Sequence, residues 1–336
     1  MTPGIAAKAA SDLLPATAGV CAVVVTFNRK AMLRDCLNSV LGQSRLPDHI
    51  LIIDNHSTDG TLDMLRTEFE QLPSGPGITI LPLRENRGGA GGFAEGFDWA
   101  HRNGFEWIWT MDDDIEMLPG ALEMLLSYQE VSDFIQCRRN TPDAGPILDS
   151  LWDVSSASAS HPHSRMLHEA SAPASSLGVS VPVDGRRSWI PVQWGNFEGA
   201  LIHRSIVDRI GLPDERFFVG GDDSTYGLEA SFHTSVILVK EYGVRRKLSL
   251  PERPSKLAHY LMLRNRFIIR DHLRKLGFSV HPIVFWTSQM VVLAWIVKTV
   301  LRDSGETKKL EMLGAVLRGL MDGVNGRFGR PAFLKA

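Results

Sequence analysis

Cysteine is scarce in this sequence of 336 residues, which has only Cys21, Cys36 and Cys137. Three scattered cysteines are too few for a disulfide framework or a cysteine-rich zinc site. We therefore expect reduced thiols in an intracellular protein, with Cys21 and Cys36 filling core positions.

An excess of charge of one sign is also lacking, because 36 basic and 38 acidic residues leave a formal net charge of −2. This balance excludes a generally basic protein that binds nucleic acid. Hydrophobic residues make up 44% of the chain and charged residues 22%, so a sizeable core can form and a disordered chain is excluded.

Long apolar runs are absent except for one. Residues 1–18 contain none, and we expect them to be a loose tail and not a signal peptide. The uncharged segment 277–297 is long enough to cross a bilayer, but polar residues interrupt it and basic residues flank it. It is compatible with an interfacial or partner-packing helix, a buried helix, or a membrane span.

Strand and helix patterns alternate in the first half of the chain, which indicates an α/β sheet. Apolar periodicity predicts a helix after each of the first three strands, and the second helix is expected to be capped near Ser57 or Thr58. The strands are predicted at 21–27, 49–54, 78–83 and 106–111, with a further one at 235–240.

Composition divides the chain into three parts: the tail at 1–18, an α/β domain at 19–250, and a C-terminal helical region at 251–336. Within the α/β domain, residues 138–188 are rich in Ser, Ala, Pro and His. This composition predicts a long loop or lid.

Polar residues follow each of the first four strands. Ligands of open α/β sheets bind beyond the carboxyl ends of the strands, so these residues should converge at one edge. They are Thr26–Arg29, Asp54–Asn55, Arg84–Arg87 and Asp112–Asp114.

The glycine-rich turn Gly88–Gly92 opens a predicted helix. Its exposed amides and the helix N-terminus favour a phosphate group. The alternative is a tight connection between strand and helix.

Three aspartates, Asp112, Asp113 and Asp114, follow the fourth strand. Buried together they repel one another, and a hard divalent cation is the expected compensation. In an extended chain Asp112 and Asp114 point the same way, so both can reach one ion. The alternative is a helix cap upstream of Pro119.

A second acidic pair, Asp222 and Asp223, follows an apolar run and two glycines. The functional interpretation is a carboxylate held at a pocket mouth as a general base. The alternative is an N-cap pair for the helix that begins there.

These segments, taken in order, resemble the inverting family 2 glycosyltransferases, and within that family the bacterial galactofuranosyltransferases. The resemblance covers about residues 21–267. It implies a GT-A fold, a Rossmann-like mixed sheet flanked by helices, and transfer of galactofuranose from a UDP-sugar donor to a glycan or lipid-linked acceptor. The matching segments are VVVTFNR, LIIDNHSTDG, ENRGGAGGFAEG, WTMDDDIEM, GLPDERFFVGGDDSTYGLEA and HYLMLRNRF.

The resemblance also implies where the donor binds. Thr26, Asn28 and Arg29 would line the nucleotide site, and Asp54 would contact the uracil or ribose. Three residues of the glycine turn would border the donor sugar and diphosphate, namely Asn86, Gly88 and Gly89. Asp113 would belong to the same donor site.

By the same resemblance, Asp112 and Asp114 would hold the Mn²⁺ or Mg²⁺ that bridges the diphosphate. Asp223 would be the base, with Asp222 beside it. Trp194 would shape the acceptor pocket, and core packing is the alternative for this residue.

The sequence departs from the family pattern where a metal-binding histidine is usual, since that stretch reads KEYGVRRKLSL. Arginine cannot ligate a metal but pairs well with phosphate. We therefore expect the ion to be held by Asp112, Asp114, diphosphate and water, with Arg245 or Arg246 neutralising the leaving group. His203, His233 and His259 are the substitute ligands to consider, and two surface arginines near a membrane are the alternative.

Other functions remain open. A rhamnosyl- or other hexosyltransferase and a non-catalytic nucleotide-sugar-binding module are compatible with the same motifs. A sugar-nucleotide pyrophosphorylase is disfavoured because TFNRKAML, and not a glycine-rich loop, follows the first strand. We expect a cytoplasmic protein that contacts the inner face of the cell membrane through its C-terminal helices.

Overall fold

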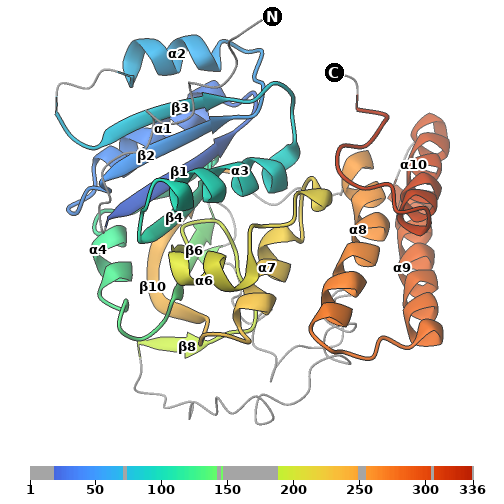
Figure 1. Cartoon of the computed structure of the whole chain (residues 1–336). Coiled ribbons are helices and arrows are strands. Elements are labelled where there is room, and N and C mark those ends of the chain that lie inside the picture. The colour runs from blue at the N-terminus through green and yellow to red at the C-terminus, as the bar shows by residue number, and fades with distance from the viewer. Residues whose placement is uncertain are drawn as a thin grey trace, which may run out of the picture.

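The first half of the chain folds as alternating strands and helices (Figure 1). The structure is a computed structural model that describes residues 19–70, 74–141, 145–146, 188–248, 255–303 and 306–334. The predicted tail therefore lies outside the described residues. The elements of this half are β1 (Val20–Thr26), α1 (Lys30–Leu41), β2 (His49–Asp54), α2 (Thr61–Glu68), β3 (Gly77–Pro82), α3 (Gly88–Arg102) and β4 (Trp107–Asp112).

The second half adds short strands, helices and the C-terminal helical region. Its first elements are β5 (Ile115–Met117), α4 (Ala121–Leu126), β6 (Phe134–Thr141), β7 (Gly145–Pro146), β8 (Trp189–Pro191) and β9 (Leu201–His203). They are followed by α6 (Arg204–Ile210), the 3₁₀ turn η3 (Glu215–Phe217), α7 (Asp222–Ala230), β10 (Ile237–Arg246), α8 (Lys256–Lys275), α9 (Pro282–Asp303) and α10 (Glu306–Val324).

Several predicted boundaries differ from the structure. Residues 138–141 are the end of β6, so they are not loop, and most of the remaining predicted lid lies outside the described residues. The strand predicted at 235–240 continues to Arg246 as β10, and β5 follows the aspartates directly. Neither acidic segment supplies a helix cap, because the N-cap residues of α4 and α7 are Gly120 and Gly221.

The strands of the described residues form one mixed sheet of ten strands, with the main order β3-β2-β1-β4-β9-β6-β10-β5. Strand β1 lies between β2 and β4 and is parallel to both. The register sets Thr26 opposite Asp54 and Val25 opposite Asp112, so the carboxyl ends of the three strands are level. The predicted mixed sheet, flanked by helices and followed by a helical region, is confirmed.

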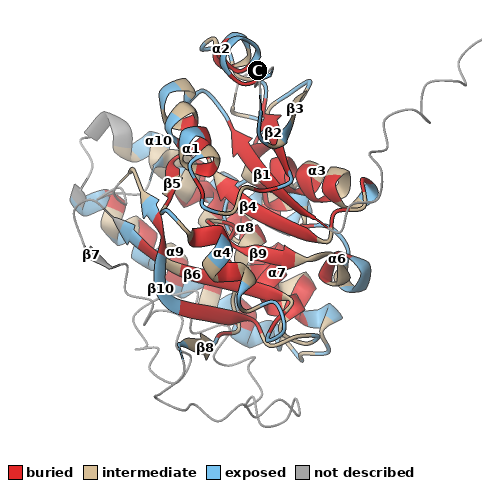
Figure 2. Ribbon diagram, turned by 90° about the vertical axis from the view of Figure 1, so that its left-hand side faces the viewer, coloured by how far each residue is buried: buried red, intermediate tan, exposed pale blue. Residues whose placement is uncertain are grey.

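Helices cover both faces of the parallel strands, and β1, β2 and β4 are almost wholly buried, whereas the edge strand β3 is not (Figure 2). Alternate side chains of β1 enter opposite cores. Ala22 and Val24 pack with residues of α1 and α2, whereas Val23 and Val25 pack with residues of α3. Burial on both faces explains the continuous apolar run of this strand.

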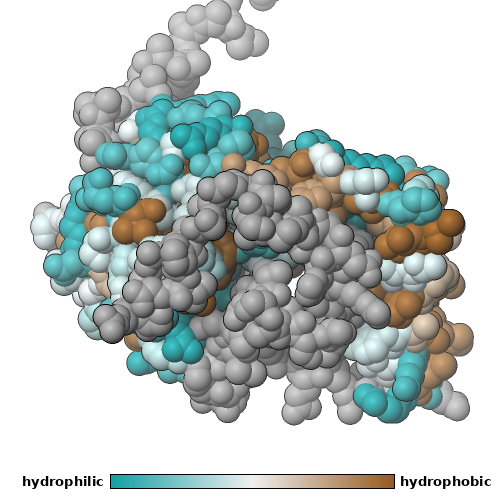
Figure 3. All heavy atoms as spheres, turned by 90° about the horizontal axis from the view of Figure 1, so that it is seen from below, coloured by the Kyte–Doolittle hydropathy of each residue, from teal (hydrophilic) through white to brown (hydrophobic). Residues whose placement is uncertain are grey.

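The C-terminal helices stand beside the sheet, with α8 between it and the pair α9 and α10 (Figure 1). Hydrophobic residues gather on the outer side of this region (Figure 3). On its inner side, α8 shares a core with Ala90 and Phe217.

The first glycine of the turn, Gly88, touches the segment before the second acidic pair. Gly88 has a φ of +72°, and a Cβ at this position would lie 2.0 Å from the carbonyl oxygen of Phe218. Gly89 has nothing within 4 Å of such a Cβ. The two glycines therefore serve different purposes although they are adjacent in sequence.

We predict that Gly88→Ala destabilises the fold by about 2–4 kcal/mol, from left-handed strain and steric overlap. Gly89→Ala is the matched control and should change stability by less than about 1 kcal/mol. Urea unfolding of both variants tests this. Equal stability of the two would contradict the close contact between Gly88 and Phe218.

Candidate active site

Asp113 ties the end of β4 to the end of β1. Its carboxylate accepts hydrogen bonds from the Thr26 hydroxyl at 2.8 Å, the Phe27 amide at 3.2 Å and the Arg29 guanidinium at 3.0 Å. Burial raises the pKa of Asp113, and the charge of Arg29 and these hydrogen bonds oppose that rise. Three residues predicted at the donor site are thus in direct contact.

Arg29 also pairs with the buried Asp114, at 2.9 Å from Oδ2. One guanidinium nitrogen of Arg29 therefore forms ion pairs with two of the three aspartates. The side chain of Arg29 is 42% exposed, so this positive charge faces the outside of the site.

Asp112 is the aspartate without a compensating partner. Within the described part of the chain, no donor forms a hydrogen bond with its carboxylate. Burial, followed by the negative charges of Glu198, Asp114, Asp113 and Asp222, raises the pKa of Asp112 well above its usual range. The two acidic motifs, far apart in sequence, therefore share one electrostatic site.

The second acidic pair begins α7. Asp222 is buried, and burial followed by the charge of Asp223 raises its pKa to about 8. Asp223 is half-buried and accepts a hydrogen bond from the Ser224 amide at 2.6 Å. Its pKa is raised mainly by burial and also by Glu198, while Arg139 opposes the rise.

Glu198 and Arg139 are site residues that the sequence reasoning missed. Glu198 joins two arginines, with Arg139 at 3.1 Å and Arg246 at 3.2 Å. The predicted loop at 138–188 hid Arg139, which lies in β6. A charged residue inside the otherwise apolar stretch FEGALI was the available signal for Glu198.

The structure distinguishes the two arginines proposed for the leaving group. Arg246 is mostly buried and faces Glu198, whereas Arg245 is 60% exposed and pairs with Glu116 on the surface. Of the two, Arg246 lies beside the acidic site.

Asn28 and Asp54 organise the loop after β2. Asn28 has a left-handed backbone and bonds Ser57 and Thr58 at 2.9 and 2.7 Å. The buried Asp54 accepts a hydrogen bond from the Ser57 amide at 3.0 Å. The predicted cap at Ser57 or Thr58 is therefore wrong, because these residues bind the loop and α2 begins at Thr61.

The glycine turn is held by two asparagines. Asn86 accepts a hydrogen bond from the Gly88 amide at 2.7 Å, and Asn55 bonds the Gly88 carbonyl at 2.7 Å and the Arg87 amide at 2.8 Å. Asn55 was predicted among the polar residues at this edge of the sheet, but its contacts with the glycine turn were not predicted. Gly89, with open space beside it, leaves room for a ligand.

Trp194 is half-buried, and the core packing considered for it is present, whereas its role at an acceptor pocket stays a prediction. It packs against the core shared by α3, η3 and α8. It also lines a small pocket with Arg139 and Asn196, on the side of the acidic site.

The three histidines considered as substitute ligands lie elsewhere. His203 caps α6 and pairs with Glu106, His233 is exposed, and His259 bonds a backbone carbonyl of α8. No group of three or more His, Cys, Asp or Glu side chains among the described residues forms a ready metal site.

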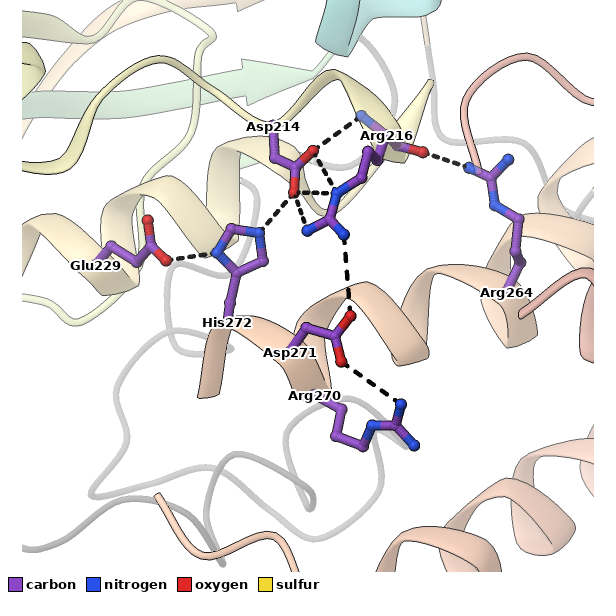
Figure 4. A network of polar contacts seen from close by, with 7 residues as sticks. All are labelled: Asp214, Arg216, Glu229, Arg264, Arg270, Asp271 and His272. Atoms are coloured by element: carbon purple, nitrogen blue, oxygen red, sulfur yellow. Dashed lines mark hydrogen bonds and ion pairs between the residues drawn. The ribbon is translucent and has the colours of Figure 1, made fainter. Parts of the chain in front are cut away.

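Helix α8 fixes the loop that precedes Asp222 (Figure 4). Arg264 donates to the carbonyls of Phe217 and Arg216 at 2.6 and 3.1 Å. The Asn265 amide donates to the carbonyls of Phe217, Val219 and Gly220 at 2.9–3.2 Å. The RNR motif of the sequence thus positions the second acidic pair.

The same helix is joined to α7 by His272, which bonds Asp214 and Glu229 (Figure 4). Burial lowers the pKa of His272, but these two carboxylates outweigh it and the net pKa is raised. Burial also disfavours the ionised form of Asp214. Hydrogen bonds from His272 and Arg216 outweigh this effect and hold the pKa of Asp214 well below its usual range.

A surface hollow of about 930 Å³ lies beside this joint, lined by residues that include Arg87, Asp98, Asp214 and His272. Its carboxylates are already paired with basic residues, namely Arg87, Arg102, Arg216, Arg270 and His272. The strand ends differ from this hollow, because Asp112 there has no such partner among the described residues.

We predict that His272→Gln lowers stability by about 3 kcal/mol, because two partly buried carboxylates lose their charged partner. The wild-type contribution is complete below the unfolded pKa of histidine and is lost as pH rises through the raised folded pKa. Thermal melts from pH 6 to 9 should therefore show a decline that His272→Gln lacks. The exposed His233→Gln is the control, and a decline retained in His272→Gln would refute the assignment.

The family described as Glycosyl transferase family 2 matches residues 21–148. The galactofuranosyltransferase GlfT1 of Mycolicibacterium smegmatis is 34% identical over 214 residues, which cover 61% of this chain and 62% of that protein. GlfT1 of Mycobacterium tuberculosis H37Rv is 32% identical over 213 residues, covering 62% of each chain. The matched stretch thus spans less than two thirds of these relatives.

Two solved structures share the fold. TarS 1-349 of S. aureus in complex with UDP has a TM-score of 0.53 and 12% identity, over 92% of this chain and 82% of that one. The mannosyltransferase PcManGT of Pyrobaculum calidifontis, in complex with GDP-Man and Mn²⁺, has a TM-score of 0.51 and 15% identity, over 93% and 90%. At these identities the likeness concerns the fold alone.

Proposed function

Because this chain has a GT-A fold and contains a glycosyl transferase family 2 domain, we propose that it is an inverting glycosyltransferase. Its donor is UDP-galactofuranose, and its acceptor is a glycan or lipid-linked glycan of cell-surface polysaccharide synthesis. The observation that carries the proposal is the shared electrostatic site of Asp112, Asp222, Asp223 and Glu198. The choice of sugar is supported by the names of the relatives at 32–34% identity.

The donor lies across the carboxyl ends of β1, β2 and β4. Asn28 and Asp54 organise the loop that receives the uridine, and Thr26 and Arg29 border it. The diphosphate lies near Arg29 and the turn Gly88–Gly89, where exposed positive charge and open space support this placement.

The residues at the end of β4 fit a divalent cation. Their carboxylate oxygens are hard ligands of the kind that Mn²⁺ and Mg²⁺ prefer. Asp112 is repelled by four carboxylates and has no donor among the described residues, so a cation there would relieve its isolation. Asp112 and Asp114 would hold the ion, which when bound supplies positive charge against the leaving diphosphate.

Asp223 acts as the general base. It takes the proton of an acceptor hydroxyl as that oxygen bonds to the anomeric carbon, while the bond from this carbon to the diphosphate oxygen breaks. Attack from the face opposite UDP inverts the configuration and needs no covalent enzyme intermediate. The raised pKa of Asp223 makes its carboxylate a stronger base than a free aspartate.

The neighbours of Asp223 have supporting roles. The carboxyl group of Asp222, ionised or protonated, lies beside the base and orients the substrate. Glu198 holds Arg139 and Arg246 in place at the site, where Arg246 meets charge that develops on the departing UDP. Trp194 forms a wall of the acceptor pocket beside Arg139.

We predict that Asp223→Asn lowers transfer by about 10²–10⁴-fold, because it removes the general base. UDP affinity should stay near the wild-type value, whereas Asp114→Ala should weaken both UDP binding and transfer. The measurements are UDP release with acceptor for UDP-galactofuranose, UDP-galactose and dTDP-rhamnose, and UDP binding by calorimetry.

The exposed Asp63→Asn on α2 is the matched control and should behave as wild type. Near wild-type turnover of Asp223→Asn would refute the base assignment. Faster turnover with dTDP-rhamnose would favour a rhamnosyltransferase. Binding of UDP-sugar without acceptor-dependent release of UDP would favour a non-catalytic binding module.

A further inference from the structure

Helix α9 (Pro282–Asp303) is apolar on both of its sides. The inner side is buried in cores shared with α8 and α10, through Phe285, Val292, Ile296 and Val300. The outer side is exposed and carries large apolar residues at 41–67% exposure. These outer residues are Ile283, Val284, Trp286, Met290, Val291, Trp295 and Leu301.

The outer residues form one continuous face, because they recur at helical spacing along five turns. We call them the α9 face. Viewed from below, the side of the molecule formed by the C-terminal helices is strongly hydrophobic (Figure 3). The neighbouring α10 adds a row of exposed Leu310, Leu317, Met321 and Val324.

The charged residues of segment 277–302, which carries the α9 face, are all basic, and the helix then ends at Asp303. The sequence contains no Asp or Glu from Gly277 to Arg302. Lys298 and Arg302 are exposed at the end of α9, and Arg274 and Lys275 are exposed at the end of α8. A second copy would bring like charges together, whereas an anionic surface complements them.

Helix α9 is long and apolar enough to cross a bilayer, with a mean hydropathy of 1.6 over its most apolar window. Its packing argues against a span. Arg266 on α8 is fully buried and donates to Ser288, two turns into α9. A spanning α9 would carry this arginine into the hydrocarbon, which is costly.

We propose that α9 lies in the plane of an anionic lipid surface. The α9 face enters the boundary between headgroups and acyl chains, where Trp286 and Trp295 are favourable. Lys298 and Arg302 contact the lipid phosphates, and the buried inner side keeps α9 attached to α8. This inference does not depend on the proposed sugar transfer.

The test is flotation of the full chain with vesicles of phosphatidylcholine, with and without phosphatidylglycerol. We expect wild-type protein to float with the anionic vesicles and to bind them about ten-fold more than neutral ones. The double variant Ile283→Glu/Val291→Glu should lose flotation. Both positions are more than half exposed, so its melting curve and UDP binding should match the wild type.

Val131→Glu is the matched control, because Val131 is 42% exposed but lies on the α/β domain, and this variant should float. Flotation of the double variant, or failure of the wild type to float, would overturn the proposal. A wild-type dimer that the double variant converts to monomer without any flotation would assign the face to a second copy. Resistance of the wild type to alkaline extraction from membranes would instead indicate a span.

Discussion

The repulsion among carboxylates brought together at the strand ends is the constraint on which the site depends. Burial raises the pKa values of Asp112, Asp222 and Asp223, and the charges of neighbouring carboxylates, Glu198 among them, raise these values further. Arg29, Arg139 and Arg246 compensate part of this charge. Asp112 is left without such a partner among the described residues. A divalent cation, bound together with the diphosphate of the donor, would balance its negative charge.

Helix α8 connects the parts of the molecule that this chemistry requires. On one side, Arg264 and Asn265 hold the loop before Asp222, and His272 joins α8 to Asp214 and Glu229. On the other side, α8 carries the packed inner face of α9. A surface bound by α9 would therefore have a fixed position relative to the base, which suits an acceptor attached to lipid.

The sequence predicted the parallel strands well because β1, β2 and β4 are buried on both faces and read as unbroken apolar runs. It also predicted the convergence of Thr26, Arg29 and the aspartates, since parallel strands end at one edge. It failed where tertiary contacts decide. The pairing of Glu198 with Arg139 and Arg246 arises only when β6, β10 and the segment before β9 are adjacent. Ser57 bonds the loop that follows β1 and does not cap a helix.

The most direct test of the account is anomalous scattering at the manganese edge from crystals grown with UDP and Mn²⁺. The account predicts a manganese peak at Asp112 and Asp114 in contact with the diphosphate. It also predicts that Asp223 faces the open side of that complex. UDP bound in the hollow beside His272, or a manganese peak remote from β4, would contradict it.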